Sequence, residues 1–467
     1  MTPGLLRCLA WAILMSAAQS MPVHAQTEPL FDPTPPAAGP PHSPLIGTAF
    51  EPLVRLGQDL VAAGVLPRLR YVQSFAANPI GGLTQGTDTS GVVIAGADFN
   101  LNQLVQLPGA QIHVTFAQFY GHELATDHIG TRTKVQSFYY PNKQFELAEL
   151  TYEQRLFDNR LAVVVGRANA TGEFARSTYG CRFQNVVDCP FELTQAVGGF
   201  PGFPYVNWGG YVRFNPTGET YMKAGAFETN SVRNHNTGFA WGFEHSTGFV
   251  LPVEIGYGTD FATDPYPRHL KVGGWYNSAD YPDPFLNRAG KSRGLVGERP
   301  LLHGGGRAGG YALADQVVYR PDTTTARGMA VFASAGVPFD GNGIFAFEGV
   351  AGAIWTGPSA GRPGDQIGVL GSYIRLSNKE DGYLNALLAK ARSPDIIHRN
   401  QFIFELNYNY KVIDGVYLAP SLQYIVNPDT ISRTVATKAP RDALVVGLKL
   451  ALNMNETLGL PNNSNSR

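Results

Sequence analysis

Strand-like segments recur along this chain almost to its end, and the connections between them alternate between short and long. An antiparallel barrel in a membrane has short turns on one rim and long loops on the other, whereas a soluble sandwich has no reason to sort its connections by length. The pattern therefore predicts an all-β, transmembrane antiparallel barrel. The short turns are 157–160, 215–220 and 411–415, and the long connections are 121–144, 169–208, 277–309 and 377–400.

Alternating hydrophobicity and turn residues predict about sixteen strands between residues 69 and 454. An even number returns the C-terminus to the periplasmic side, where the N-terminus starts. The four long connections then all follow odd-numbered strands and lie on the external rim. The predicted strands are 69–76, 92–101, 111–119, 145–157, 161–168, 209–214, 221–228, 250–257, 270–276, 310–319, 329–337, 345–355, 366–376, 401–410, 416–426 and 443–454.

Individual strands have one apolar and one polar face. Phe402 and Phe404, for example, share a face opposite Glu405 and Asn407. Because side chains alternate across a strand, the apolar face suits lipid and the polar face suits a lumen. A soluble antiparallel sheet shows the same alternation, but the sorting of the loops and the aromatic residues at strand ends favour the membrane. Those aromatic residues are Trp355, Tyr408, Tyr410 and Tyr424.

The N-terminus has the features of a secretory signal peptide. Arg7 supplies the positive charge, a short apolar stretch follows, and residues 23–25 form a small-x-small cleavage site. Apolar residues with helical spacing and a stop at Gly64 predict a short helix over 51–64, before the barrel. The predicted layout is a signal peptide at 1–25, a Pro-rich linker at 26–48, a helical segment at 49–68, the barrel at 69–454 and a polar tail at 455–467.

Composition limits the partners of this chain. Charged residues make up 16% of it, below the ~25% typical of soluble domains. The formal net charge is −1, so there is no basic surplus with which to neutralise the phosphates of nucleic acid. Cys181 and Cys189 are close together in one long loop of an exported chain, which predicts a disulfide. A metal site would need further Cys or His residues nearby, so no metal or other cofactor is expected.

Several short segments, taken in order, resemble one known family. The chain is similar to the carbohydrate-selective, OprB-like outer-membrane porins over most of its length. The resemblance implies a sixteen-stranded barrel whose channel, narrowed by charged residues and an inward-folded loop, passes small sugars such as glucose. It maps the disulfide onto Cys181 and Cys189 and the family's Gly-Arg pair onto Gly166 and Arg167. The segments are GVVIAGADFNLNQL (91–104), ELTYEQRLFDNRLAVVVGR (149–167), CRFQNVVDC (181–189), YVNWGG (205–210), FETN (227–230), PVEIGY (252–257), LKVGGWY (270–276), PSLQYIVNP (420–428) and ALVVGLK (443–449).

Two features depart from this family. The last strand ends on Met454 and a polar tail rather than on a terminal aromatic residue, and Lys449 stands where Arg is frequent. A point charge there replaces a planar fork, which changes how a sugar is contacted.

Charged residues at strand positions are the candidate pore-lining and sugar-contacting groups, because a charge facing lipid is costly. Arg and Glu offer directional hydrogen bonds to sugar hydroxyls, and an aromatic face suits the C–H face of a pyranose. The mixture of acid and base predicts weak ion selectivity. The candidates are Glu149, Glu153, Arg155, Arg167, Arg213, Glu254, Lys271, Glu405, Lys449 and Trp208, with Tyr205 as a further aromatic residue.

The expected partners are small sugars in transit, the lipid bilayer with lipopolysaccharide, and the barrel-assembly machinery, with a homotrimer as one assembly. A general diffusion porin without sugar preference is an alternative. An outer-membrane hydrolase is another, for which His113, His122 and His128 would be candidates, but no GxSxG marks a nucleophile. His122 and His128 share a loop with Glu123 and Asp127, where a metal is conceivable but a solvated loop is the simpler reading. A soluble, exported β-rich binding protein is the third alternative. The sequence favours a channel in the bacterial outer membrane rather than an enzyme.

Overall fold

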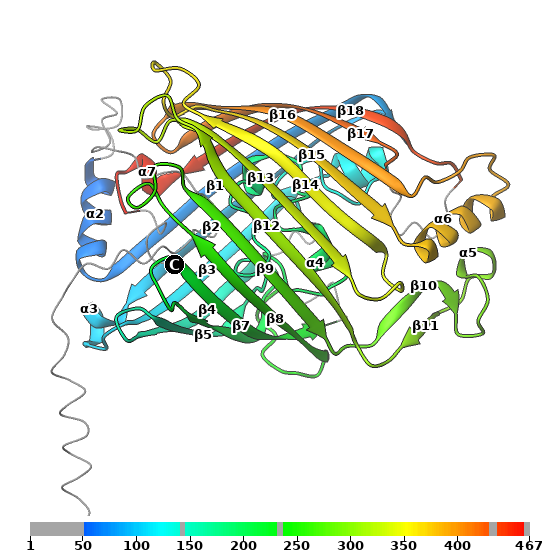
Figure 1. Ribbon diagram of the computed structural model, residues 1–467, viewed down its shortest axis with the longest axis horizontal. Coiled ribbons are helices and arrows are strands. Elements are labelled where there is room, and N and C mark those ends of the chain that lie inside the picture. The colour runs from blue at the N-terminus through cyan, green and yellow to red at the C-terminus, as the bar shows by residue number, and fades with distance from the viewer. Residues whose placement is uncertain (1–50, 141–144, 231–236, 429–436, 462–467) are drawn as a thin grey trace, which may run out of the picture.

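The computed structural model describes residues 51–140, 145–230, 237–428 and 437–461. Sixteen antiparallel strands form one closed barrel in these residues (Figure 1). The predicted signal peptide (1–25) and Pro-rich linker (26–48) lie outside the described residues. The barrel strands are β1 (Val65–Gly82), β2 (Thr87–Asn100), β3 (Ala110–Gly121), β4 (Phe145–Leu156), β5 (Leu161–Ala168), β6 (Asn207–Phe214), β7 (Thr220–Asn230), β8 (Ser246–Gly258), β9 (Arg268–Asn277), β12 (Arg307–Tyr319), β13 (Gly328–Pro338), β14 (Phe345–Thr356), β15 (Gln366–Leu376), β16 (Asn400–Ile413), β17 (Val416–Val426) and β18 (Arg441–Asn453).

Each strand pairs with its sequence neighbours, and β1 closes the ring by pairing with β18. In this seam Phe75 lies opposite Leu448 and Tyr71 opposite Leu452. The predicted fold class and each of the sixteen predicted strands are confirmed, and β5, β15 and β17 begin and end where expected. The main differences are in the first two strands, because β1 runs from Val65 to Gly82 where 69–76 was predicted, and β2 begins at Thr87 where residue 92 was predicted.

The predicted N-terminal helix is also present. Helix α2 (Glu51–Ala62) ends two residues before Gly64, whose φ of 88° breaks the helix. Gly57 on α2 faces the C-terminal tail, where a Cβ would approach Leu460 to 2.6 Å. The tail forms a short helix, α7 (Met454–Thr457), and the side-chain amide of Asn455 donates to the Pro67 carbonyl of β1 at 2.7 Å. The first and last helices of the described chain, α2 and α7, thus both lie at the periplasmic rim, at the left of Figure 1. Within the described part of the chain, the helices are too short or too polar to cross a bilayer.

The opposite rim carries structure that the sequence did not predict. A hairpin of β10 (Tyr281–Asn287) and β11 (Pro300–His303) encloses α5 (Arg293–Val296), and α6 (Asn378–Lys390) packs against both (Figure 1). The buried Asp283 accepts from His303 Nε2 at 2.7 Å and forms an ion pair with Lys379 of α6. This cap joins two long connections on the external side.

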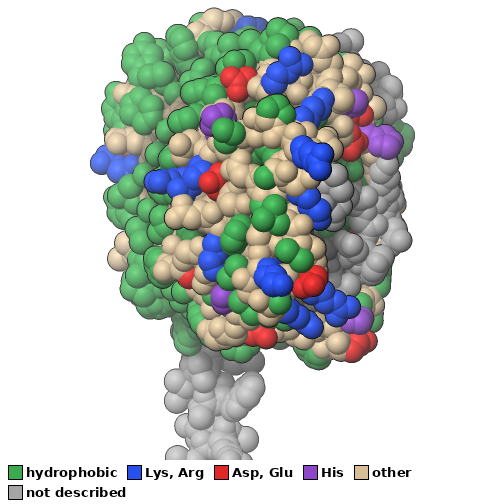
Figure 2. All heavy atoms as spheres, turned by 90° about the vertical axis from the view of Figure 1, so that its right-hand side faces the viewer, with side chains coloured by type: hydrophobic (Ala, Val, Ile, Leu, Met, Phe, Trp, Pro, Cys, Tyr) green, Lys and Arg blue, Asp and Glu red, His purple; other side chains and the backbone are tan. Residues whose placement is uncertain are grey.

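The outward faces of the strands are apolar, as predicted. On β16, Phe404 and Leu406 are each 51% exposed, whereas Glu405 between them is 3% exposed. Figure 2 views the barrel from its external end, with hydrophobic side chains covering the flank and Lys and Arg side chains spread over the end. A continuous apolar flank is what a bilayer requires of a barrel.

The lumen is partly filled by two loops that turn inward. We call them L2 (122–144, described to residue 140) and L3 (169–206). L3 contains the short helices η2 (Gly180–Arg182) and α4 (Glu192–Ala196), and L2 contains η1 (Ala125–Ile129). Much of the apolar core belongs to these loops, including the fully buried Leu124, Phe174, Phe183 and Phe191. The largest apolar core of the described chain therefore lies inside the barrel.

Candidate functional site

L3 is held inside the barrel by carboxylates on three strands. Glu405 of β16 accepts the backbone N–H groups of Gln184 and Asn185 at 2.8 and 2.7 Å. Glu254 of β8 accepts the backbone N–H of Ala175 at 3.0 Å. Glu348 of β14 accepts the backbone N–H of Leu193 at 2.5 Å. All three carboxylates are nearly inaccessible to solvent. A loop buried in a lumen must find acceptors for its own N–H groups, and these carboxylates supply them.

Lysines hold the carbonyl side of the same loop. Lys271 of β9 donates to the Arg176 carbonyl at 3.1 Å, and Lys223 of β7 donates to the Glu173 carbonyl. Lys223 also pairs with Glu254 at 3.2 Å. The first part of L3 is therefore fixed to β7, β8 and β9 through both polar groups of its backbone.

Aromatic packing fixes the rest of L3. The rings of Phe183 and Phe332 lie 5.9 Å apart, and those of Phe174 and Phe227 lie 6.1 Å apart with their planes almost perpendicular. A Cβ at Gly336 of β13 would lie 2.5 Å from the Phe191 ring, so a glycine is needed where this side chain meets the wall. L3 therefore follows the lumenal wall from β6 to β17 in a single, well-packed position.

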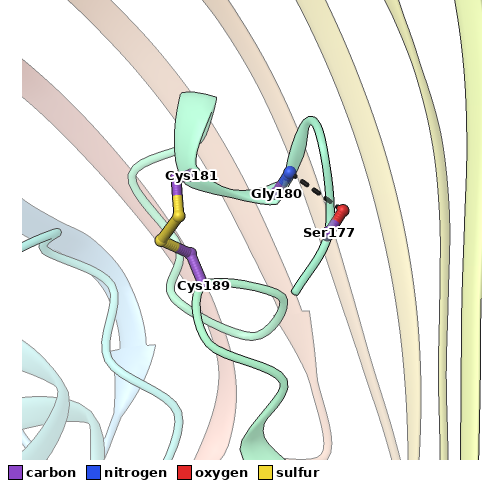
Figure 3. The surroundings of a disulfide bond; sticks show 4 residues. All are labelled: Ser177, Gly180, Cys181 and Cys189. Carbon is purple, nitrogen blue, oxygen red and sulfur yellow. Dashed lines mark hydrogen bonds between the residues drawn. A yellow bond between two sulfur atoms is a disulfide. The ribbon is translucent and has the colours of Figure 1, made fainter. Parts of the chain in front are cut away.

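The predicted disulfide is present in the part of L3 that lies against β16 and β17. Cys181 and Cys189 are bonded, with their Cα atoms 4.8 Å apart, and close a small ring within L3. Figure 3 shows this ring beside the curved barrel wall, with the Gly180 N–H donating to Ser177 Oγ at 3.1 Å. The ring includes Gln184 and Asn185, so the disulfide stiffens the segment that Glu405 binds.

L2 meets L3 inside the barrel. The Val186 N–H of L3 donates to the Lys134 carbonyl of L2 at 3.0 Å. Gln423 of β17 donates to the Val135 carbonyl at 2.9 Å, and Gln136 donates to the Ser74 carbonyl of β1 at 3.3 Å. L2 thus bridges from β1 to β17, and the two loops together narrow the lumen.

The wall formed by β1 to β4 carries a polar network, which we call the lumenal ladder. His113 contacts Asp98 at 2.7 Å through Nδ1 and Glu153 at 3.0 Å through Nε2. Arg68 pairs with Asp98 at 2.9 Å, and Arg155 Nε donates to Glu153 at 2.6 Å. Acids and bases alternate across neighbouring strands, so nearly every charge has an opposite partner. The ladder consists of Arg68, Asp98, His113, Thr115, Glu149, Glu153 and Arg155.

An aromatic cluster lies next to the ladder, where L2 and L3 approach the same wall. Tyr140 of L2 packs edge-on against Tyr205 of L3, with ring centroids 4.5 Å apart. Phe138, two residues before Tyr140, is half-buried, and the Arg70 guanidinium lies 5.3 Å from the centroid of its ring. The φ of Phe138, 61°, is unusual for a residue other than glycine. The cluster gives the lumen aromatic faces close to hydrogen-bonding groups.

The predicted site residues fall into distinct groups. Glu149, Glu153 and Arg155 come together in the lumenal ladder, and Arg213 of β6 faces the lumen with its guanidinium 4.5 Å from the Tyr221 ring. Lys449 lies buried on the lumenal face of β18. Three of the predicted residues instead hold L3, namely Glu254, Lys271 and Glu405.

Arg167 and Trp208 differ from the prediction. Arg167 shares a face with Val165, which is 49% exposed, and this is the outward face of β5. Arg167 is 1% exposed, and its guanidinium lies 5.5 and 5.8 Å from the rings of Trp208 and Trp241. The prediction assumed that a strand charge avoids lipid by facing the lumen. Here two indole rings shield the charge instead, and cation–π contacts compensate for lost hydration.

Sequence reasoning missed several lumenal residues. Arg68 lies one residue before the predicted start of the first strand at residue 69. Arg70 and Asp98 lie within predicted strands but were not selected as candidates. His113 was considered only as a hydrolase residue, but both of its ring nitrogens are engaged by carboxylates. The alternation of side chains along each strand could have identified them, because each lies on the polar face of its strand.

The histidines of L2 form no metal site in the described residues. His122 Nδ1 is 3.8 Å from Asp127 Oδ2, and both side chains are well exposed. No group of three or more His, Cys, Asp or Glu side chains in the described chain is arranged to hold a metal ion.

Comparisons with known proteins agree on one family. A family model described as carbohydrate-selective porin, OprB family, matches residues 84–454. The chain is 26% identical to porin B of Pseudomonas aeruginosa over 415 residues, which cover 84% of this chain and 88% of that protein. Among solved structures, the high-pH form of Pseudomonas putida OprB matches with a TM-score of 0.76 and 24% identity, over 85% of this chain and 96% of that one. The low-pH form of the same protein matches with a TM-score of 0.54 and 18% identity, over 87% and 97% of the two chains.

Proposed function

The chain belongs to the OprB family of carbohydrate-selective porins, and we propose that its barrel passes monosaccharides such as glucose along the lumenal ladder. The observation that carries this proposal is the narrowing of the lumen by L2 and L3. The last part of L3, which includes Phe203 and Tyr205, approaches the wall that carries the ladder, while the earlier part of the loop lies along the other strands. The barrel is an outer-membrane channel for sugars, and the route within it is the part proposed here.

The chemistry of the ladder suits a hydroxylated solute in transit. Its side chains alternate donors and acceptors over β1 to β4, so a sugar can exchange one hydrogen bond for the next as it moves. Because the charged side chains of the ladder already pair with one another, a hydrogen bond to a sugar hydroxyl replaces an existing contact of the ladder. Weak, repeated contacts are what a selective channel requires for both entry and release.

We also propose the residues that line this route. They are the predicted Glu149, Glu153, Arg155 and Arg213, together with Arg68, Arg70, Asp98 and Thr115. Phe138 and Tyr205 supply aromatic faces for the apolar side of a pyranose. Glu254, Lys271 and Glu405 act indirectly, since they determine where L3 lies.

The remaining parts of the proposal concern export and assembly. A signal peptide at 1–25 would direct the chain across the inner membrane, and the assembly machinery would insert the barrel beside lipopolysaccharide. A homotrimer is the proposed assembly to test first, since an apolar flank of this kind can pack against a second barrel as well as against lipid.

Liposome swelling with sugars of increasing size tests the proposed function. We expect proteoliposomes to swell rapidly in glucose or galactose and much more slowly in sucrose and maltotriose. Glu149→Gln should lower the rate for monosaccharides, while Glu244→Gln, an exposed change on an external loop, should not. Swelling that depends on solute mass alone, at a rate unaffected by Glu149→Gln, would identify a general diffusion porin.

A further inference from the structure

The disulfide ring of L3, residues 181–189, lies against the lumenal wall. Glu405 of β16 accepts two backbone N–H groups of the ring, and the side-chain amide of Gln184 donates to the Ala419 carbonyl of β17 at 2.8 Å. Gln184 and Asn185 are almost fully buried. One side of the ring is therefore closed by the wall of the barrel (Figure 3).

L2 covers another part of the ring. The Val186 N–H donates to the Lys134 carbonyl of L2 at 3.0 Å, and the neighbouring Val187 is fully buried. Cys181 and Cys189 themselves are half-buried. The two cysteines are therefore open to small molecules in the lumen, but only inside a barrel that two loops already narrow.

Forming this disulfide by exchange requires direct contact between sulfur atoms. A thiolate of the ring attacks the disulfide of a Cys-X-X-Cys oxidoreductase and forms a mixed disulfide, and the second thiolate of the ring then displaces the enzyme. The two thiols of the chain become a disulfide and the enzyme disulfide becomes a dithiol. Two electrons and two protons thus pass to the enzyme.

A folded barrel excludes such an enzyme. A domain of about 100 residues has a radius of gyration of about 13 Å, and its reactive sulfur would have to come within about 2 Å of a sulfur of the ring. Sixteen strands enclose a channel for small solutes, and here L2 and L3 fill part of it. The sulfur atoms of the ring are therefore out of reach of a folded oxidoreductase from either rim.

The ring itself needs no barrel in order to close. Its cysteines are 8 positions apart in the chain, and the entropic cost of closing a loop is low when the loop is short. Within the ring, the Val187 N–H donates to Asn185 Oδ1 at 3.1 Å. Gln184 and Glu405, by contrast, are 221 residues apart and meet only when the barrel forms.

We propose that the Cys181–Cys189 disulfide is formed in the periplasm on the unassembled chain, by a thiol–disulfide oxidoreductase, and that the folded barrel is not a substrate of this enzyme. L3 then enters assembly with its ring already closed, and the closed ring presents Gln184 and Asn185 to Glu405 in a restricted segment. This inference concerns the order of maturation and is independent of which solute the channel passes.

Reoxidation of the reduced protein tests whether the folded barrel excludes the enzyme. The folded barrel is reduced with a small phosphine, and its heat modifiability on a gel confirms that it stays folded. The same chain, diluted from urea without detergent, serves as the unassembled form. A Cys-X-X-Cys oxidoreductase of thioredoxin-like size should oxidise the folded barrel at least about a hundredfold more slowly than the unassembled chain, because only rare local opening exposes the ring. Hydroxyethyl disulfide, a small oxidant, should oxidise both forms.

The order of events in cells gives a second, independent readout. Cells are pulse-labelled, quenched in acid and treated with a maleimide that adds mass to each free thiol. The disulfide should be present before the heat-modifiable barrel appears, and it should accumulate in the unassembled chain when barrel assembly is blocked. The double variant Cys181→Ser, Cys189→Ser marks the mobility of a chain that lacks both thiols.

Two results would overturn the proposal. One is enzymatic oxidation of the folded barrel at the rate of the unassembled chain. The other is a pulse-labelled chain whose thiols persist until after the heat-modifiable form has appeared. Neither result bears on the proposed sugar channel, because conductance and glucose block are measured on the oxidised barrel in both cases.

Discussion

Replacing Glu405 by Gln should loosen L3 from the barrel wall. The carboxylate of Glu405 accepts two backbone N–H groups, from Gln184 and Asn185, at 2.8 and 2.7 Å, in a site that is 3% exposed. A glutamine oxygen can replace one of these contacts, but the amide nitrogen would then face the other N–H. Hydrogen bonds to a buried charge contribute about 1.5–3 kcal/mol each, so the variant should weaken this anchor by about 2–4 kcal/mol.

That loss has a measurable consequence for the channel. A weakening of about 2–4 kcal/mol raises the population of the locally detached segment by a factor of about 30 to 1000. The other anchors, Glu254 and Glu348, keep the remainder of L3 in place. Single-channel recordings of Glu405→Gln should therefore show a larger mean conductance and more open-channel noise, and proteoliposomes should admit sucrose faster than wild type.

The control removes a charge without touching L3. Glu244→Gln changes an exposed carboxylate on the connection between β7 and β8, and it should leave conductance, noise and sucrose entry unchanged. If Glu405→Gln folds but retains the wild-type conductance, noise and size limit, then the carboxylate does not determine the width of the channel. That result would refute the role assigned here to L3.

Three further predictions follow from other contacts. Reducing the Cys181–Cys189 disulfide, or replacing both residues by Ser, should destabilise its small ring by about 2–3 kcal/mol and increase channel noise. Recordings of the wild type with and without reductant, and of the double Ser variant, provide the check. Burial alone would raise the pKa of Asp283, but Lys379, His303 and two backbone N–H groups lower this pKa from 3.8 to about 2. The external cap should therefore lose about 2 kcal/mol of stability as pH falls from about 4 to 2 and the carboxylate becomes protonated. Hydrogen exchange in β10 and α6 measures this loss, and Asp283→Asn should be less stable at neutral pH but insensitive to pH in that window. Arg167→Leu should lower the temperature at which the barrel unfolds on a gel while leaving the half-blocking concentration of glucose unchanged, and a weakened glucose block would return Arg167 to the lumen.

Local pattern was sufficient to predict the barrel. The number of strands, their order and their inward and outward faces follow from alternation along each strand, as Phe404 and Glu405 illustrate. The sorting of connections by length identified the two rims, because turns and loops differ in sequence as well as in structure. These properties depend on residues close to one another in the chain, so the sequence displays them directly.

The interior of the barrel depends on contacts that the sequence does not display. Gln184 and Glu405 are separated by 221 residues, and no local signal indicates that one binds the other. For the same reason, residues predicted as pore lining, such as Lys271, prove to be anchors for L3. Arg167 shows a second limit, since part of the shielding of its outward-facing charge comes from Trp241, a residue of a distant connection.

The most direct test of a narrowed sugar channel is single-channel conductance of the purified protein titrated with glucose. The geometry predicts steady pores whose current falls saturably as glucose rises, with a weaker block in Glu149→Gln. Steady pores whose current is indifferent to glucose would contradict a sugar site in the lumen, even though the barrel itself would stand.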